Sequence, residues 1–241
     1  MTTLVSGFID RSRYDPVRPS RPVEFYLEHG KALLALDVPK VIFLEPHVIA
    51  LLEETIKASP HTTVVPFTKE EMEYWPSRNR FLACPPPPGG SPSKDTHDFM
   101  IVMLNKVSWC IQAEALNPYT TELFAWVDFG INYILKEVSL NDAVTHLVAP
   151  GRVRPGTLRI PGCKHFFPPY HPAQLVWKYC GGLFCGDVAT LKRMQADQRT
   201  VVVHLLDANL VTWEVTVWYY MQAPYMDRYI ANHDATMFTQ F

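Results

Sequence analysis

Three short apolar runs, separated by segments of helical periodicity, dominate the first part of the chain. The runs at residues 4–10, 40–45 and 62–67 have the length of buried strands. Between them, residues 22–36 and 47–57 place apolar side chains on one helical face. Repeated strand–helix–strand units of this kind give parallel strands joined by right-handed crossovers. We therefore predict an α/β fold with a mainly parallel central sheet flanked by helices.

The remainder of the chain continues the same alternation with more turns. We expect a long helix at residues 95–116, strands at 122–127 and 179–186, and a helix from residue 188 onward. Residues 76–94 contain a run of four prolines and two glycines, which indicates a surface excursion that is extended or mobile. No internal repeat or long linker is evident, so a single domain is expected.

The composition is that of a globular protein without a strongly charged surface. The 241 residues are 48% hydrophobic and 19% charged, and the net charge is −2, so no broad basic field for nucleic acid is expected. No apolar run approaches the roughly 20 residues that a bilayer requires, and the first residues do not resemble a signal peptide. Five cysteines without C-x-x-C spacing suit reduced thiols. We expect a cytoplasmic protein with no transmembrane segment.

The run at residues 124–130, FAWVDFG, ends a buried strand in a single carboxylate. A lone Asp at such an exit is costly unless a metal, a cation or backbone N–H groups satisfy it. The carboxyl ends of strands are also where ligands sit in α/β sheets. Our hypothesis is that Asp128 holds a divalent ion on the diphosphate of a nucleotide-sugar. The pattern leaves open an Asp that only caps the following turn.

The strand expected at residues 179–186 contains Gly181, Gly182 and Gly186. Glycines inside a strand mark a close approach of a ligand or of another backbone. They predict either a groove wall against which a flat substrate lies or tight packing on a neighbouring strand.

Two further titratable groups lie in the C-terminal part. Glu214 follows Trp213 on an expected helix, and an apolar neighbour makes a carboxylate a stronger base, so Glu214 is a candidate general base. The alternative is a solvated helix residue. His233 is a candidate to complete a metal site with Asp128, because mixed imidazole and carboxylate ligands suit manganese. An isolated histidine without a ligand role remains the alternative.

Several segments together resemble a known family. They are residues 3–10, 22–26, 41–44, 104–106, 117–121, 124–130, 181–186 and 210–214. In this order they resemble the HtrL/YibB group of bacterial proteins, which are related to glycosyltransferases with the GT-A fold. The resemblance covers most of the chain and departs at residues 76–94 and at roughly 150–170. The W-V-D-F-G match is fairly specific, whereas G-G-x-F-x-G is shared by many sugar transferases.

The resemblance implies a GT-A-like fold. A Rossmann-like nucleotide-binding half would cover residues 1–130, and an acceptor-side half residues 131–241. Asp128 falls on the acidic motif at the end of the central strand. Phe129 and Gly130 stand where many GT-A enzymes carry a second acid, so the common D-x-D motif is incomplete and the number of protein metal ligands is in question.

The activity implied is that of a metal-dependent hexosyl- or pentosyltransferase in glycan biosynthesis. A sugar would move from a nucleotide-diphosphate-sugar, UDP- in preference to GDP-, to a glycan, glycolipid or glycoprotein acceptor, with Mn²⁺ or Mg²⁺ on the diphosphate. Such enzymes work in the bacterial cytoplasm or, for a viral protein, in the cytoplasm of the host. If the reaction inverts the anomeric carbon, Glu214 or Asp187 would deprotonate the acceptor hydroxyl.

The same resemblance extends to the residues that would bind the donor. Asp128 and His233 would hold the metal, beside the groove wall formed by Gly181 and Gly182. The base and ribose would be held around Val5, Ser6 and Phe8. The phosphate would be bound by Arg11, Arg13 or Lys106, and the alternative for the loop arginines is that they are only solvated.

Two other readings stay open. One is a catalytically weakened GT-A-like protein that binds a nucleotide or sugar without turnover, which the incomplete acidic motif favours. The other is a different α/β enzyme, such as a nucleotidyltransferase or phosphohydrolase. The second lacks the phosphate-binding glycine loop or clustered acids expected near residues 4–13.

Overall fold

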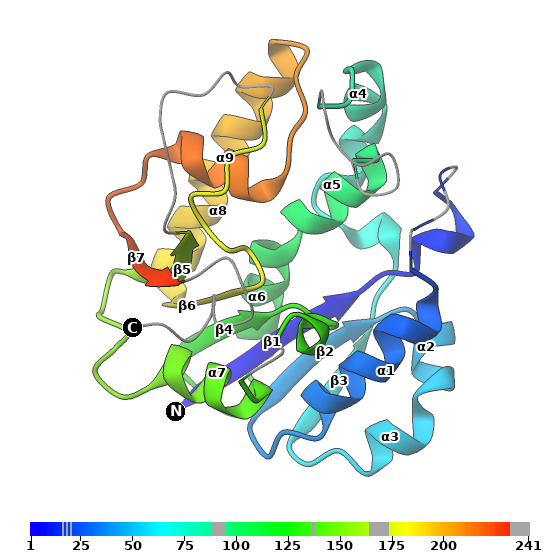
Figure 1. Ribbon diagram of the computed structural model, residues 1–241, viewed down its shortest axis with the longest axis vertical. Helices are drawn as coiled ribbons and strands as arrows, with labels where there is room; N and C mark the ends of the chain where they lie inside the picture. Colours follow the sequence, from blue (N-terminus) through cyan, green and yellow to red (C-terminus); the bar gives the residue numbers. More distant parts are fainter. Residues whose placement is uncertain are drawn as a thin grey trace.

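The computed structural model describes residues 1–15, 17, 19, 21–87, 95–135, 138–163 and 174–231. Its centre is one seven-stranded sheet with the strand order β3-β2-β1-β4-β6-β5-β7 (Figure 1). The strands are β1 (Thr2–Phe8), β2 (Lys40–Leu44), β3 (Thr62–Pro66), β4 (Leu123–Val127), β5 (Leu158–Cys163), β6 (Leu183–Asp187) and β7 (Met226–Ala231).

The first four strands of the chain are all parallel to one another. β1 pairs with β2 on one side and with β4 on the other, and β2 pairs with β3. β6 then runs antiparallel to β4, with Leu183 opposite Val127 and Asp187 opposite Leu123. β5 is antiparallel to β6, and β7 is parallel to β5. The predicted α/β class with a mainly parallel sheet is confirmed.

Helices cover both faces of this sheet. Their bounds are α1 (Val23–Leu34), α2 (Pro46–Leu51), α3 (Glu53–Lys57), α4 (Arg78–Ala83), α5 (His97–Leu104), α6 (Lys106–Leu116), α7 (Leu140–Val148), α8 (Val188–Asp207) and α9 (Glu214–Met221). Short 3-10 turns are η1 (Arg11–Arg13), η2 (Lys69–Glu71), η3 (Trp75–Ser77) and η4 (Ile131–Tyr133). In Figure 1, α5, α8 and α9 lie in the upper part of the molecule, and α1 and α7 in the lower part.

Alternation along the strands creates one hydrophobic core on each face. In β4, Phe124 and Trp126 join the core formed with α5, α6, α8 and α9. Ala125 and Val127 point into the other core, with α1, α2 and α7. A strand buried on both faces reads as a continuous apolar run, which is why residues 122–127 were recognisable as a strand.

Three boundaries differ from the sequence-based expectation. The helix expected at 95–116 is interrupted at Asn105 and forms α5 and α6. The helix expected at 47–57 divides at Leu52. The strand expected from residue 179 begins at Leu183, because the two glycines before it form a turn.

The expected surface excursion at 76–94 is wrong for its first part. Residues 78–83 form α4, and Phe81 is buried in the core. Residues 88–94 lie outside the described part of the chain. The prolines that follow α4 therefore mark the end of a helix.

One apolar helical stretch reaches membrane-spanning length within the described residues. It covers 97–116, and 61% of its most apolar window is buried inside the protein. This stretch is α5 and α6, which pack into the core, and a buried core helix of a globular protein has the same length and composition.

Candidate active site

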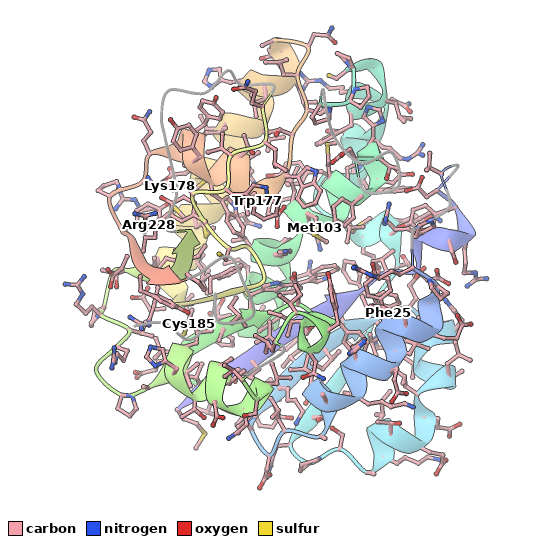
Figure 2. The ribbon with its side chains drawn as sticks, in the orientation of Figure 1. Phe25, Met103, Trp177, Lys178, Cys185 and Arg228 are labelled. Atoms are coloured by element: carbon pink, nitrogen blue, oxygen red, sulfur yellow. The ribbon has the colours of Figure 1, made fainter. Side chains whose placement is uncertain are left out.

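A cavity of about 380 Å³ opens where β1 and β4 end. The helix that follows β1 covers one face of the sheet, and the helices that precede β4 cover the other face. Such a switch point between neighbouring parallel strands leaves a crevice in which α/β proteins bind their ligands. Trp177 and Met103, both in the cavity wall, are labelled near the centre of Figure 2.

Three charged side chains meet at the base of this cavity. The Lys106 ammonium lies 2.9 Å from Asp128 Oδ1 and 2.9 Å from Glu214 Oε1. It also donates to the Gly181 carbonyl oxygen at 3.0 Å. These contacts join the start of α6, the end of β4, the start of α9 and the turn before β6. Segments that are far apart in sequence therefore converge on one ammonium group.

Backbone and aromatic contacts hold Asp128 in place. Its N–H donates to the Gly182 carbonyl oxygen at 2.9 Å, and the Trp126 indole N–H donates to its Oδ1 at 2.6 Å. The Trp126 ring stacks on Trp109, with ring centres 5.4 Å apart and planes within 5°. The carboxylate is thus oriented by a donor that core packing has already fixed.

Burial and charge have opposite effects on Lys106. Its residue surface is 1% exposed, and burial alone would lower the pKa of the ammonium. The carboxylates of Asp128 and Glu214 outweigh that effect, and the pKa of Lys106 is raised. Lys106 is therefore a permanent positive charge at neutral pH. With both carboxylates ionised, the cluster of Lys106, Asp128 and Glu214 carries a net charge of −1.

Two buried polar atoms of the cavity residues have no partner in the described structure. They are Glu214 Oε2, on a residue that is 3% exposed, and the Trp109 indole nitrogen. Buried polar groups almost always find a hydrogen-bond partner. Both atoms belong to residues that line the cavity, which makes them candidates for contact with a polar ligand.

The glycine-rich turn lies at the cavity and is also closely packed. Gly181 and Gly182 line the cavity, as a groove wall would. A Cβ atom on Gly181 would lie 2.5 Å from Glu214 Oε1, so the same residue is also required for close packing. Gly186 lies deeper in the sheet, where a Cβ would meet a Leu158 methyl group at 3.0 Å.

Aromatic and guanidinium groups form the outer walls. Arg21 lies over the Tyr133 ring at 4.3 Å. Arg11 lies over Phe99 at 4.7 Å and donates to Asp15 at 2.6 Å. The cavity wall also includes Phe8, Tyr26, Trp177 and Trp213. No sequence motif points to the cavity residues Arg21, Tyr26, Tyr133 and Trp177, because they lie on irregular segments or at isolated helix positions.

Most of the residues expected at the site line this cavity. They are Phe8, Arg11, Lys106, Asp128, Gly181, Gly182 and Glu214. Val5 and Ser6 are fully buried within β1 and do not line it. His233 lies outside the described residues.

Asp187 lies at the opposite end of the strands from the cavity. It ends β6 and caps α8, accepting hydrogen bonds from the Thr190 and Gly156 N–H groups, each at 2.7 Å. Burial alone would raise the pKa of its carboxyl group, but these N–H donors lower it. Because β6 runs antiparallel to β4, its C-terminal residue lies far along the sheet from Asp128. The structure does not bring Asp187 to the cavity.

The described residues do not fit a divalent metal ion. Among them, no group of three His, Cys, Asp or Glu side chains is arranged to hold one. Asp128 offers a carboxylate that is 31% exposed, but an ammonium group lies 2.9 Å away. The Asp128 and His233 metal site expected from the sequence therefore remains a prediction.

No protein-family model matches the sequence, and no curated protein matches it. Similar solved structures include mouse xyloside xylosyltransferase 1 in its apo form, with 11% identity and a TM-score of 0.48, covering 95% of this chain and 85% of that chain. Another is mannose-1-phosphate geranyltransferase from Thermus thermophilus, with 14% identity and a TM-score of 0.40, covering 95% and 73%. A third is 4-diphosphocytidyl-2C-methyl-D-erythritol synthase from Anaerococcus prevotii, with 8% identity and a TM-score of 0.43, covering 96% and 86%. The fold of the chain is a mixed α/β fold in which a parallel half, β3-β2-β1-β4, is continued by a mixed half, β6-β5-β7.

Proposed function

We propose that the protein is a glycosyltransferase that moves a sugar from a nucleotide-diphosphate-sugar to a hydroxyl group of an acceptor. The observation that carries this proposal is the cluster of Lys106, Asp128 and Glu214 at the switch point, in which Glu214 Oε2 is buried without a hydrogen-bond partner in the described structure. The GT-A-like sheet order and the resemblance to the HtrL/YibB group support it.

The donor is proposed to lie across the ends of β1 and β4. Phe8, Tyr26 and Tyr133 supply aromatic surface for the base, and Arg11 and Arg21 supply positive charge for the diphosphate. This arrangement leaves the donor sugar beside the charged cluster. We expect UDP-sugars to bind in preference to GDP-sugars.

The net charge of the cluster suits glycosyl transfer. As the bond from the anomeric carbon to the diphosphate breaks, its electron pair leaves with the nucleoside diphosphate and positive charge develops on the sugar ring. Two fixed carboxylates with one ammonium leave an excess of −1 that stabilises this charge. The acceptor oxygen forms the new bond to the anomeric carbon. In an inverting reaction its proton passes to Glu214 Oε2.

The acceptor is proposed to enter from the side of Trp213 and Trp177. Trp177 is 37% exposed and its ring meets Trp213 edge-on at 5.5 Å. Exposed indole rings beside a carboxylate offer an apolar surface together with a hydrogen-bond acceptor, which suits a glycan, glycolipid or glycoprotein sugar. The Mn²⁺ or Mg²⁺ ion expected from the sequence is assigned no step, because the described residues do not fit it.

A thermal-shift screen with UDP-glucose, UDP-galactose, UDP-N-acetylglucosamine and GDP-mannose tests the proposal. A donor present at 100 times its Kd raises the Tm of a chain of this size by roughly 5–10 °C. The same donor is expected to be hydrolysed slowly without acceptor, and Asp128→Asn to abolish hydrolysis. No shift with any nucleotide-sugar would contradict the proposal. A shift without hydrolysis or transfer would establish the weakened binding protein instead.

A further inference from the structure

The Lys106 ammonium stands where a divalent ion would be expected, between the acid that ends β4 and the acid that begins α9. We propose that Lys106 is the resident cation of this site and takes the place of the metal, so that the donor is bound and transferred without a divalent ion. This inference rests on the proposed function for its consequence, but its structural part concerns only the Lys106, Asp128 and Glu214 side chains.

The ammonium group is fully coordinated by the protein. It donates three hydrogen bonds, to Asp128 Oδ2 at 3.3 Å, to Glu214 Oε1 at 2.9 Å and to the Gly181 carbonyl oxygen at 3.0 Å. Asp128 Oδ1 lies 2.9 Å from the same ammonium group. An ammonium group has no further donor. A divalent ion on the same carboxylates would face this positive charge at short range, which opposes its binding.

Lys106 cannot easily move aside to admit a metal. Its side chain is 2% exposed, and its departure would leave two carboxylates without their cation in a buried site. The lysine is also the first residue of α6, whose packing against β1 and β4 fixes where the side chain begins. The cation is therefore part of the folded core.

The positions after Asp128 support the same conclusion. Phe129 is 3% exposed and fits against Gly30, where a Cβ would lie 2.2 Å from the ring. Gly130 admits the Tyr26 ring, which would lie 3.0 Å from a Cβ. Phe129 and Gly130 both pack against residues of α1. Neither position therefore supplies a second acid for a metal ion.

The decisive experiment compares metal responses of wild type and Lys106→Ala. Each protein is treated with EDTA, dialysed and titrated with MnCl₂ alone while its Tm is measured. Removing the ammonium leaves the two carboxylates with a net charge of −2 and vacant space. We expect Mn²⁺ at 100 times its Kd to raise the Tm of Lys106→Ala by roughly 5–10 °C and to leave wild type unchanged.

Lys40→Ala is the matched control. Lys40 is also fully buried, but its ammonium donates to the carbonyl oxygens of Leu36, Val38 and Pro60. Burial lowers the pKa of Lys40, and Asp37 is near enough to oppose that effect, but Asp37 forms no ion pair with Lys40 in the described structure. Its removal is expected to lower stability without creating a response to Mn²⁺. An equal response in both variants would overturn the proposal, because the effect would not come from the acids that Lys106 pairs.

Wild type provides a second measurement if Lys106→Ala does not fold. Its Tm gain and hydrolysis with a UDP-sugar are expected to be the same in EDTA and in MnCl₂. Loss of either in EDTA, with recovery in MnCl₂, would overturn the resident-cation proposal while leaving the glycosyltransferase proposal intact. A folded Lys106→Ala that ignores Mn²⁺ would also overturn it. If no nucleotide-sugar binds but Lys106→Ala gains a Mn²⁺ response, the function is wrong and the assignment of the cation stands.

Discussion

Glu214→Gln isolates the charge of the most deeply buried acid at the site. Glutamine has nearly the same shape, and its amide oxygen can still accept from Lys106, so the substitution removes charge without opening a cavity. Breaking a buried ion pair by removing one partner costs about 3–5 kcal/mol. Here Lys106 keeps Asp128 and the Gly181 carbonyl, so we expect the low end, about 3 kcal/mol of unfolding free energy.

This loss corresponds to a Tm lower by roughly 6–12 °C for a chain of this size. Urea unfolding at pH 7, followed by circular dichroism, measures the free energy directly. Glu28→Gln is the control: Glu28 pairs with Lys31, but its side chain is 71% exposed, and no measurable change is expected. A Glu214→Gln protein as stable as wild type would refute the buried cluster. If Glu214 also takes the acceptor proton, turnover falls by roughly 10²–10⁴-fold.

Three further changes test neighbouring parts of the structure. Gly181→Ala places a methyl group against the Glu214 carboxylate and is expected to cost about 1–3 kcal/mol in urea unfolding and to weaken donor binding; unchanged values would show that the turn can yield. Trp126→Phe removes the indole N–H bonded to the site aspartate and should cost about 2 kcal/mol, measured in the same way. Burial, with help from Arg159, lowers the pKa of His146 to about 4 from its ordinary 6.5. The unfolded chain therefore binds more protons between these values, stability falls as the pH drops through that window, and His146→Gln should make the fall in Tm shallower.

The sheet and the place where its cavity opens could be predicted from local pattern. The strands around residues 4–10, 40–45 and 122–127 are buried on both faces, and such strands leave continuous apolar runs in the sequence. Asp128 was recognisable because a carboxylate ends one of these runs. The direction of β6 has no comparable local signal, since an antiparallel and a parallel strand of five residues can carry the same side chains. The sequence alone therefore did not show that Asp187 lies away from the cavity.

The cluster itself required the tertiary structure. Lys106, Asp128 and Glu214 were each singled out, but for separate reasons: phosphate binding, metal binding and a carboxylate beside tryptophan. Their convergence depends on where α6 and α9 begin relative to the end of β4, which no local pattern records. Sequence reasoning considered Trp213 as the neighbour that sets the environment of Glu214. In the structure, the Lys106 ammonium lies 2.9 Å from the Glu214 carboxylate, and Trp213 contributes its ring to the cavity wall.

A lysine and a divalent ion satisfy the same two acids with different consequences for the reaction. A metal is exchangeable and brings positive charge that can sit on the diphosphate. The Lys106 ammonium is covalently attached, and its donors are consumed by the protein, so it fixes the geometry of Asp128 and Glu214 without neutralising a leaving group. Under the proposed function, the charge of the diphosphate is then met elsewhere in the cavity, where the other cationic groups among the described lining residues are the guanidinium groups of Arg11 and Arg21. The resident-cation proposal therefore separates two roles. The Lys106 ammonium holds the two carboxylates, and the guanidinium groups hold the phosphates.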